Sequence, residues 1–200
     1  MQKHLIIFVK NPVVGTVKTR LAESIGDLKA LEVYQDLMEK CRQEALKVAC
    51  KRHLFYSKAI VAIDAWSSKH FEKKIQVEGD LGIKISDACK TVFQEKGKVL
   101  IIGSDCYDLT DAIIQEAFDK LDHTDVVIGP ANDGGYYLLG TKQFHPELFQ
   151  DITWSTEKVL EETITRAKSK NLSFVLLKEL IDLDTLEDLE KSGFVLKESH

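Results

Sequence analysis

The residues GSDCYDL at 103–109 follow an apolar run at 99–102, and they place Asp105 directly after what we expect to be a buried strand. Ligands of parallel α/β sheets bind beyond the carboxyl ends of the strands. A carboxylate in that position suits a divalent metal and the phosphates that the metal bridges. The competing interpretation is structural, because Asp105 or Asp108 would also serve to cap a helix that begins near Thr110.

A second group of charges lies in KNPVVGTVKTRL at 10–21, which we expect to form the loop after the first strand. Lys10, Lys18 and Arg20 bring three cations to this loop, and such a set suits a polyphosphate. Gly15 supplies a flexible point. The spacing is neither that of a Walker A loop nor that of the G-x-G-x-x-G fingerprint. The alternative is a solvated loop whose charges bind nothing.

A third group is the glycine-rich segment GPANDGGYYLLG at 129–140. Adjacent glycines after Asp133 let a ligand lie on bare backbone amides, and Asp133 could contact a sugar hydroxyl or a metal-bound water. The alternative is a tight hairpin, because Asp-Gly and Gly-Gly are favoured turn dipeptides. Tyr136 and Tyr137 point to opposite faces of a strand, so we expect at most one to face a pocket.

A fourth group is the acidic segment LIDLDTLEDL at 180–189. Asp182 and Asp184 lie on the same side of an extended segment, and either could join Asp105 in a magnesium site. The alternative is that Asp184 or Thr185 only caps the helix that follows.

Other residues give weaker signals. Trp154 could stack on a base or a sugar, or it could belong to the core. Ser155 or Thr156 could cap the next helix. The four cysteines and six histidines show no paired metal-binding spacing, so we expect no zinc site. Cys106 is expected to pack in the interior because neighbouring acids raise a thiol pKa.

The elements that must position these residues alternate between apolar strands and amphipathic helices, which is typical of an α/β sheet. The connection 130–135 is too short for a crossover helix, so its flanking strands form an antiparallel excursion or join different parts of the sheet. Gly97 is expected to cap the end of a helix. The expected strands are 4–9, 53–56, 99–102, 125–129, 136–141 and 174–178, with 59–63 strand-like. The expected helices are 27–49, 83–95, 109–121, 156–170 and 185–191, with 66–73 helix-like.

Length and composition set the outer bounds. Two hundred residues, 44% hydrophobic and 30% charged, suit one globular domain over 1–200. The net charge of -5 gives no overall reason to bind nucleic acid or an anionic membrane. The apolar stretch before Lys10 is too short for a signal peptide or a membrane span, so we expect a cytoplasmic protein.

Nearly the whole chain resembles the bacterial glycosyltransferase-like family of the DUF2064 type, whose relatives are GT-A fold nucleotide-diphospho-sugar transferases and nucleotidyltransferases. The resemblance implies a three-layer α/β/α sandwich around a mostly parallel mixed sheet. It rests on an ordered set of motifs: K-x-P-x-x-G-x-x-KTRL at 10–21, Q-x-x-GDLG at 76–82, GSDC at 103–106, GPA-x-DGGYYLLG at 129–140, WST at 154–156 and DLDT-x-EDL at 182–189.

The resemblance also implies roles for single residues. Lys18, Arg20 and Asp105 are implied to be catalytic, and Asp105, Asp184 and Asp182 to hold Mg²⁺ or Mn²⁺. The residues implied to bind the nucleotide are Lys10, Pro12, Gly15, Lys18, Thr19, Arg20, Gln76, Gly79, Asp80, Gly82 and Ser104. The residues implied to face the acceptor are Tyr107, Asp133, Gly134, Gly135, Tyr136 and Trp154.

Residues and resemblance together predict a magnesium-dependent, nucleotide-utilising transferase that is glycosyltransferase-like, with a nucleotide-sugar donor and a small-molecule acceptor. The first alternative is a nucleotidyltransferase that releases pyrophosphate from a nucleoside triphosphate. The second is a non-catalytic nucleotide-binding module, because Tyr107 stands where the family usually has proline and Lys84 where it usually has arginine. The base, the acceptor and the oligomeric state are left open.

Overall fold

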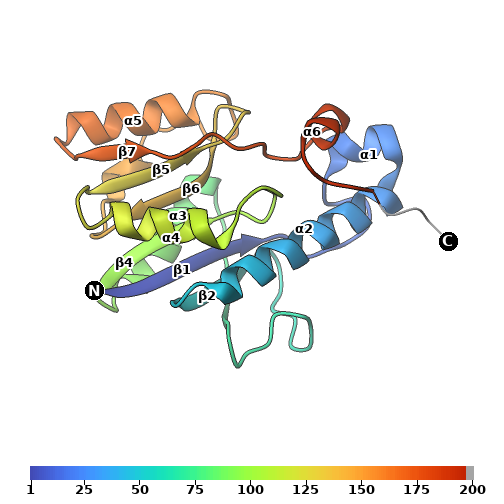
Figure 1. The fold of residues 1–200 in the computed structure, drawn as a ribbon, viewed down its shortest axis with the longest axis horizontal. Helices are drawn as coiled ribbons and strands as arrows, with labels where there is room; N and C mark the ends of the chain where they lie inside the picture. The colour runs from blue at the N-terminus through green and yellow to red at the C-terminus, as the bar shows by residue number, and fades with distance from the viewer. Residues whose placement is uncertain (197–200) are drawn as a thin grey trace.

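The computed structural model describes residues 1–196 and arranges them around one seven-stranded sheet (Figure 1). The strands are β1 (Gln2–Val9), β2 (Lys51–Tyr56), β3 (Glu72–Ile75), β4 (Gly97–Ile102), β5 (Val126–Pro130), β6 (Tyr136–Thr141) and β7 (Phe174–Leu176). The helices are α1 (Thr19–Ile25), α2 (Asp27–Lys47), α3 (Leu81–Val92), α4 (Asp111–Lys120), α5 (Val159–Ser169) and α6 (Leu186–Lys191), with the short 3-10 helix η1 (Pro146–Phe149).

The strand order is β3-β2-β1-β4-β6-β5-β7, and β6 is the one strand of residues 1–196 that runs against its neighbours. Of the two arrangements that the short 130–135 connection left open, the structure shows the antiparallel excursion. β1 pairs in parallel with β2 on one side and with β4 on the other. The chain thus adds β2 and β3 on one side of β1 and β4 on the other. Where the strand order changes direction in this way, a crevice opens beyond the carboxyl ends of β1 and β4. Lys10 follows β1 at this edge, and Asp105 lies shortly after β4.

Helices cover both faces of the sheet, so the predicted three-layer sandwich is confirmed. Alternate residues of β1 enter opposite layers, as the two-residue period of a strand requires. Leu5 and Ile7 pack in the cluster that contains α2 and α4. Ile6 and Phe8 pack in the cluster that contains α3 and α5. A separate small cluster joins α1, α2 and α6 at the far end of the molecule from the N-terminus (Figure 1).

The segment between β2 and β3 differs from the sequence prediction. Residues 59–63 form no strand, and Ile63 is 94% exposed. Residues 66–73 form no helix, because the apolar side chains of Trp66 and Phe71 anchor a loop that leads into β3. Trp66 and Phe71 are each 2% exposed and pack edge to face, with ring centroids 4.9 Å apart. Asp64 ties the same loop to the sheet, since its carboxylate lies 2.8 Å from the ammonium of Lys73.

One helix end and one further helix also differ from the prediction. Gly97 does not cap α3, which ends at Val92 with Phe93 as its C-cap, but is the first residue of β4. A Cβ at Gly97 would lie 2.5 Å from the carbonyl oxygen of Gln2, so glycine here permits close pairing of β4 with β1. Helix α1 is not expected from the sequence. It forms directly after the buried Lys18.

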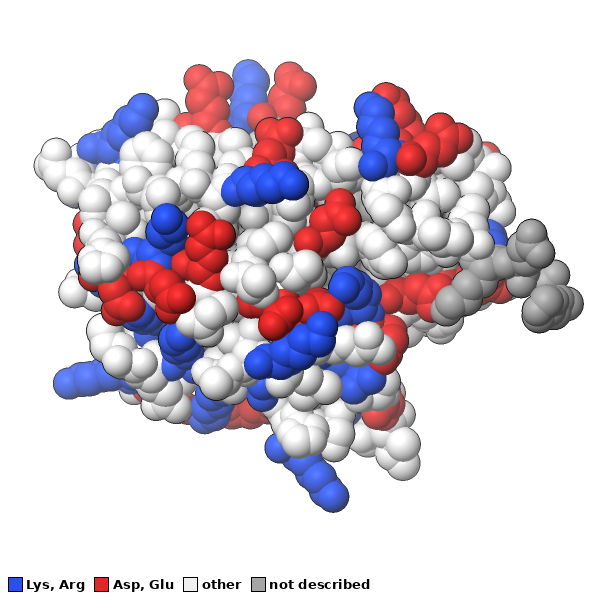
Figure 2. All heavy atoms as spheres, in the orientation of Figure 1, with Lys and Arg blue, Asp and Glu red and all other residues white. Residues whose placement is uncertain are grey.

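No helix within residues 1–196 combines the length and the apolar character that are needed to cross a membrane. On the face drawn in Figure 2, basic and acidic side chains are interspersed.

Candidate functional site

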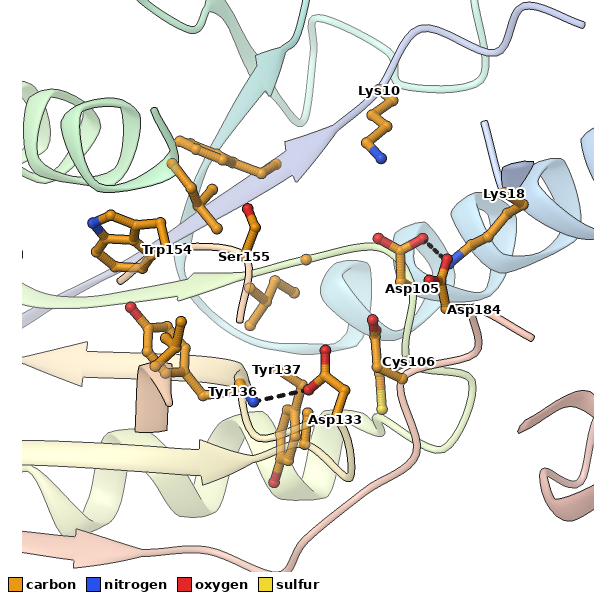
Figure 3. A pocket seen from close by; sticks show the side chains of 18 of the residues that line it. Lys10, Lys18, Asp105, Cys106, Asp133, Tyr136, Tyr137, Trp154, Ser155 and Asp184 are labelled. Carbon is orange, nitrogen blue, oxygen red and sulfur yellow. Dashed lines mark hydrogen bonds and ion pairs between the residues drawn. The ribbon is translucent and has the colours of Figure 1, made fainter. Parts of the chain in front are cut away.

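A cavity of about 920 Å³ lies beyond the carboxyl ends of β1 and β4. The close-up in Figure 3 shows charged side chains at one end of it, and Trp154 and Tyr136 at the other. Its charged and polar lining includes Lys10, Lys18, Thr19, Arg20, Asp105, Asp133, Asp182 and Asp184. Its apolar lining includes Phe8, Leu81, Ile85, Ile101, Tyr136, Trp154 and Val159.

The central contact of the charged end joins Lys18 to Asp105, whose Nζ and Oδ1 atoms are 2.5 Å apart. Lys18 is only 7% exposed, and burial acts to lower its pKa. The charges of Asp105, Asp182 and Asp184 outweigh burial and raise the pKa of Lys18 above its ordinary value. Lys18 is therefore a protonated, buried cation in an acidic pocket.

The backbone of Lys18 is left-handed, with φ 50° and ψ 43°. This conformation costs a residue with a side chain roughly 1–2 kcal/mol. Lys18 occupies the N-cap position of α1 but cannot cap it, because an ammonium has no acceptor for the helix N–H groups. Its side chain pairs with Asp105 instead. Strain of this kind persists where the surrounding contacts hold it, and functional sites are where it concentrates.

The capping interpretation of Asp105 and Asp108 is wrong. Thr110 is the N-cap of α4, and its side chain accepts a hydrogen bond from the backbone N–H of Ile113. Asp105 is free of that task, and its carboxylate faces Lys18. Its backbone carbonyl accepts a hydrogen bond of 3.1 Å from the N–H of Leu183, which fixes the acidic segment beside it.

Asp182 and Asp184 reach the same cavity from the segment before α6. Asp184 Oδ2 lies 3.2 Å from Arg20 Nη1, so this pair joins the first loop to the last motif. Burial, together with the charges of Asp105, Asp133 and Asp184, raises the pKa of Asp182 to about 7 against the pull of Lys18. The first loop, the turn after β4 and the acidic segment thus come together as predicted.

Asn132, which is not among the predicted site residues, holds the acidic segment in place. Asn132 accepts a hydrogen bond of 2.8 Å from the backbone N–H of Asp182. The amide nitrogen of Asn132 also donates to Asp188 Oδ1 at 3.0 Å. Asp188 in turn forms a capping box with Thr185 at the start of α6. The only signal for this role was the position of Asn132 between proline and Asp-Gly-Gly, where an amide is easily read as a turn residue.

Tyr34 on α2 joins the residues that follow β1 to those that follow β4 through hydrogen bonds. Its hydroxyl accepts a hydrogen bond of 2.7 Å from the backbone N–H of Lys10. The same oxygen lies 3.1 Å from the Lys10 carbonyl and 3.3 Å from Ser104 Oγ. Burial raises the pKa of this phenol above its usual range, so it stays a neutral hydrogen-bonding group. Ser104 is buried and supports the backbone of the loop rather than lining the cavity.

The apolar end of the cavity depends on contact between α3 and the loop before α5. A Cβ at Gly82 would lie 2.1 Å from Nε1 of Trp154, so glycine makes room for the indole. Tyr136 and Tyr137 belong to opposite helical layers, as expected for a strand. Both nevertheless contribute to the cavity lining, which corrects the expectation that at most one does. Ser155 and Thr156 do not cap α5, whose N-cap is Lys158.

The glycine-rich segment after β5 presents Asp133 to the cavity, with its Oδ1 atom accepting a hydrogen bond of 2.8 Å from the N–H of Gly135 (Figure 3). Gly134 has φ 84° and lies against the backbone of Glu157, where a Cβ would be 2.2 Å from the carbonyl oxygen. Gly134 therefore packs the segment onto the loop before α5, while Asp133 and Gly135 face the cavity.

Several predicted residues lie outside the cavity lining. Gln76 donates a hydrogen bond of 3.0 Å to the carbonyl of Phe55, and Asp80 caps α3 through the N–H of Ile83. The ring of Tyr107 packs edge to face on Phe194, with centroids 5.2 Å apart, in the cluster that joins α1, α2 and α6. The predicted residues absent from the lining are Pro12, Gly15, Gln76, Gly79, Asp80, Gly82, Ser104, Tyr107 and Gly134.

A family model described as an uncharacterized protein conserved in bacteria, DUF2064, matches residues 38–156, which is more than half of the chain. The chain belongs to this family. The matched region of this DUF2064 protein carries Asp105, Asp133 and Trp154, whereas the cation loop and the acidic segment lie outside it. No curated protein is significantly similar in sequence to it.

Solved structures resemble the DUF2064 protein over nearly its whole length. A protein of Desulfovibrio desulfuricans G20, provisionally named a nucleotide-diphospho-sugar transferase, is 32% identical over 94% of this chain and 85% of its own, with a TM-score of 0.88. The inositol-1-phosphate CTP transferase of T. maritima is 12% identical over 94% of this chain and 91% of its own, with a TM-score of 0.58. Rv0371C of Mycobacterium tuberculosis H37Rv, in complex with manganese, is 15% identical over 95% and 96%, with a TM-score of 0.56. The last two similarities establish the fold alone.

The cavity of the DUF2064 protein is lined by the carboxylates of Asp105, Asp182 and Asp184, which are the residues that could hold a hard divalent cation. Within residues 1–196, no three His, Cys, Asp or Glu side chains are grouped as a metal site on their own. Burial first, and then the negative charges of Asp105, Asp133 and Asp184, raise the pKa of Asp182. Mg²⁺ prefers a small number of carboxylates completed by water and phosphate oxygens, and Mn²⁺ accepts the same ligands.

Proposed function

We propose that this DUF2064 protein is a nucleotide-utilising transferase that depends on Mg²⁺ or Mn²⁺ and transfers a sugar from a nucleotide-sugar donor to a small-molecule acceptor. The observation that carries the proposal is the convergence of Lys10, Lys18 and Arg20 with Asp105 and Asp184 in one cavity. Cations for phosphates and carboxylates for a metal are the two parts that transfer from a nucleotide requires.

In this proposal the cations bind the donor's phosphates. Arg20 has a planar fork of donors that holds a phosphate oxygen pair, whereas Lys10 and Lys18 act as point charges. Asp105 and Asp184 would hold the metal, with Asp182 beside them. When it is bound, a divalent metal supplies positive charge that stabilises the leaving phosphate.

The acceptor would occupy the remainder of the cavity. Its volume of about 920 Å³ is near the upper end of the range for small-molecule sites, which leaves room for two substrates. Asp133 would accept a hydrogen bond from an acceptor hydroxyl, and Gly135 would leave the backbone open to it. Tyr136 and Trp154 would pack against its less polar side.

Nucleotidyl transfer is the second candidate, and the three cations of the first loop favour it. A triphosphate carries more negative charge than a nucleotide sugar, so it makes fuller use of Lys10, Lys18 and Arg20. The attacking group would then be a phosphate or hydroxyl of the acceptor, and pyrophosphate would leave.

Product analysis separates these reactions. The purified protein is incubated with Mg²⁺ and, in turn, pools of nucleotide sugars and of nucleoside triphosphates with candidate acceptors. Release of a nucleoside diphosphate from a nucleotide sugar supports glycosyl transfer, and release of pyrophosphate supports nucleotidyl transfer. Nucleotide binding that survives Asp105→Ala, with no turnover of any donor, would instead identify a non-catalytic binding module.

A further inference from the structure

We propose that the ammonium of Lys18, paired with Asp105, takes the place of the metal ion while no nucleotide is bound. The metal then binds only together with the nucleotide. The inference rests on the proposed function, because it concerns the regulation of the same site. It follows from the place of Lys18 among the acids, its burial and its backbone conformation.

The ammonium of Lys18 contacts Asp105, the carboxylate that the proposed function assigns to the metal. It lies 2.5 Å from Asp105 Oδ1, and Figure 3 shows Asp184 beside this contact. Lys18 is 7% exposed, so water screens the ion pair only weakly. A metal that approaches Asp105 would meet a positive charge that is already in contact with its ligand.

The loop that carries Lys18 is built so that this contact can be released. Residues 13–16 before it are all exposed, and Gly15 has φ 74°. The left-handed backbone of Lys18, at φ 50° and ψ 43°, is strained. Movement of the ammonium away from Asp105 therefore breaks one ion pair, and it permits relaxation of the backbone.

A nucleotide supplies what the release requires. Its phosphates offer the Lys18 ammonium a new anionic partner, while Asp105 becomes available to the metal. A metal without a nucleotide would place two cations around one carboxylate, with no new partner for the lysine. Metal and nucleotide affinities are consequently coupled, and each must raise the other by the same factor.

Binding of Mn²⁺ alone, followed by the loss of its free electron paramagnetic resonance signal, tests the inference. Lys18→Met removes the charge and keeps most of the apolar stem. We expect it to bind Mn²⁺ at least tenfold more tightly than the wild type, and the gain to vanish in the Lys18→Met, Asp105→Asn double variant. Equal Mn²⁺ affinity in Lys18→Met and the wild type would overturn the inference.

The matched control is Lys98→Met. Lys98 is also a buried lysine, 4% exposed and 2.7 Å from Asp122, but it lies at the opposite end of β4 from Asp105. We expect it to leave Mn²⁺ affinity at the wild-type level. A gain in Lys98→Met equal to that in Lys18→Met would show a general charge effect and would also overturn the inference.

A measurement on the wild type needs no variant to fold. The melting temperature is recorded with Mn²⁺ alone, with a mixture of the four ribonucleoside triphosphates alone, and with both. We expect the combination to raise it by more than the sum of the separate shifts. If Mn²⁺ alone gives the full shift, the Lys18 inference fails while metal dependence survives. If nothing binds in any condition, the proposed function fails, and the Lys18→Met measurement still decides the inference.

Discussion

The side chain of Asn132 holds the backbone of Asp182, accepting its N–H at 2.8 Å, and so joins the glycine-rich segment after β5 to the acidic segment before α6. The amide nitrogen of Asn132 donates to Asp188 in the same arrangement. The amide of Asn132 therefore helps to position the carboxylates of Asp182 and Asp184, which complete the charged end of the cavity. It holds Asp182 directly, and it acts on Asp184 through Asp188, which accepts the N–H of Asp184. Neither Asn132 nor Asp188 lines that cavity.

Replacing Asn132 with alanine is expected to weaken Mn²⁺ binding in the presence of nucleotide by roughly 10- to 100-fold, the range seen when the residues that orient metal ligands are lost. The measurement is Mn²⁺ titration at saturating nucleotide. Asn132→Asp keeps the acceptor for the Asp182 N–H but repels Asp188, so it should also lose affinity. Unchanged Mn²⁺ binding in both variants would mean that the acidic segment is positioned without Asn132.

Replacing Asp105 with asparagine is expected to lower metal-dependent turnover by about 100-fold or more, because it removes the charge that pairs with a cation at the centre of the site. Asp108→Asn is the neighbouring control, since Asp108 does not line the cavity. Steady-state rates of product release measure both variants. Comparable losses in the two would show that the effect comes from the turn after β4 as a whole.

Gly82 and Gly103 make a matched pair for alanine substitution. A Cβ at Gly82 would lie 2.1 Å from Trp154 Nε1, whereas a Cβ at Gly103 meets nothing within 4 Å. Gly82→Ala should destabilise the protein by about 1–3 kcal/mol and displace the indole from the apolar end of the cavity. Gly103→Ala should alter stability by less than about 0.5 kcal/mol. Urea unfolding measures both, and equal stabilities would argue against tight packing of Trp154 on α3.

Stability should fall as the pH decreases from about 6.5 towards 4, because the buried imidazoles of His4 and His53 resist protonation. Nδ1 of His4 lies 3.1 Å from Nε2 of His53. Burial lowers the pKa of His53 from 6.5 to about 4, although Glu72 opposes the shift, and burial also lowers the pKa of His4. The unfolded chain then binds more protons than the folded one, which costs on the order of 3 kcal/mol for His53 once the pH reaches 4.

Thermal unfolding across this pH range measures the effect. His53→Gln should flatten the dependence, since glutamine does not titrate. His123→Asn, a change at an exposed histidine, should leave it as in the wild type. A pH profile unchanged by His53→Gln would assign the loss of stability to other groups.

The sequence predicted the parts of the fold whose signals are local. Long apolar periods located the central strands and α2. The short 130–135 connection excluded a crossover helix and left an antiparallel excursion as one of two arrangements. The loop around Trp66 and Phe71 was misassigned because an apolar residue that anchors a loop has the same pattern as one on a helix face. Helix α1 was missed because it begins from a left-handed lysine held by a residue far along the chain.

The sequence predicted which charged residues the candidate site contains, but not the contacts that they make. Their positions after expected strands indicated that Lys18 and Asp105 belong to one edge of the sheet, and the family resemblance implied that Asp184 joins them. The sequence could not indicate that Lys18 and Asp105 form a buried pair, nor that Tyr34 and Asn132 support the surrounding loops. Those contacts join residues between 24 and 87 positions apart, and only the tertiary fold creates them.

The reversed direction of β6 has a consequence for how the family can diversify. Because β6 starts at the edge where its neighbours end, the segment 131–135 reaches the cavity without an intervening helix. Under the proposed function, exchanges at Asp133 or Gly135 would change which acceptor fits. An exchange at Asn132 in the same segment would also shift the acidic segment, because the Asn132 side chain accepts the N–H of Asp182. One short connection thus ties acceptor choice to the metal side of the cavity, and selection on the first would be constrained by the second.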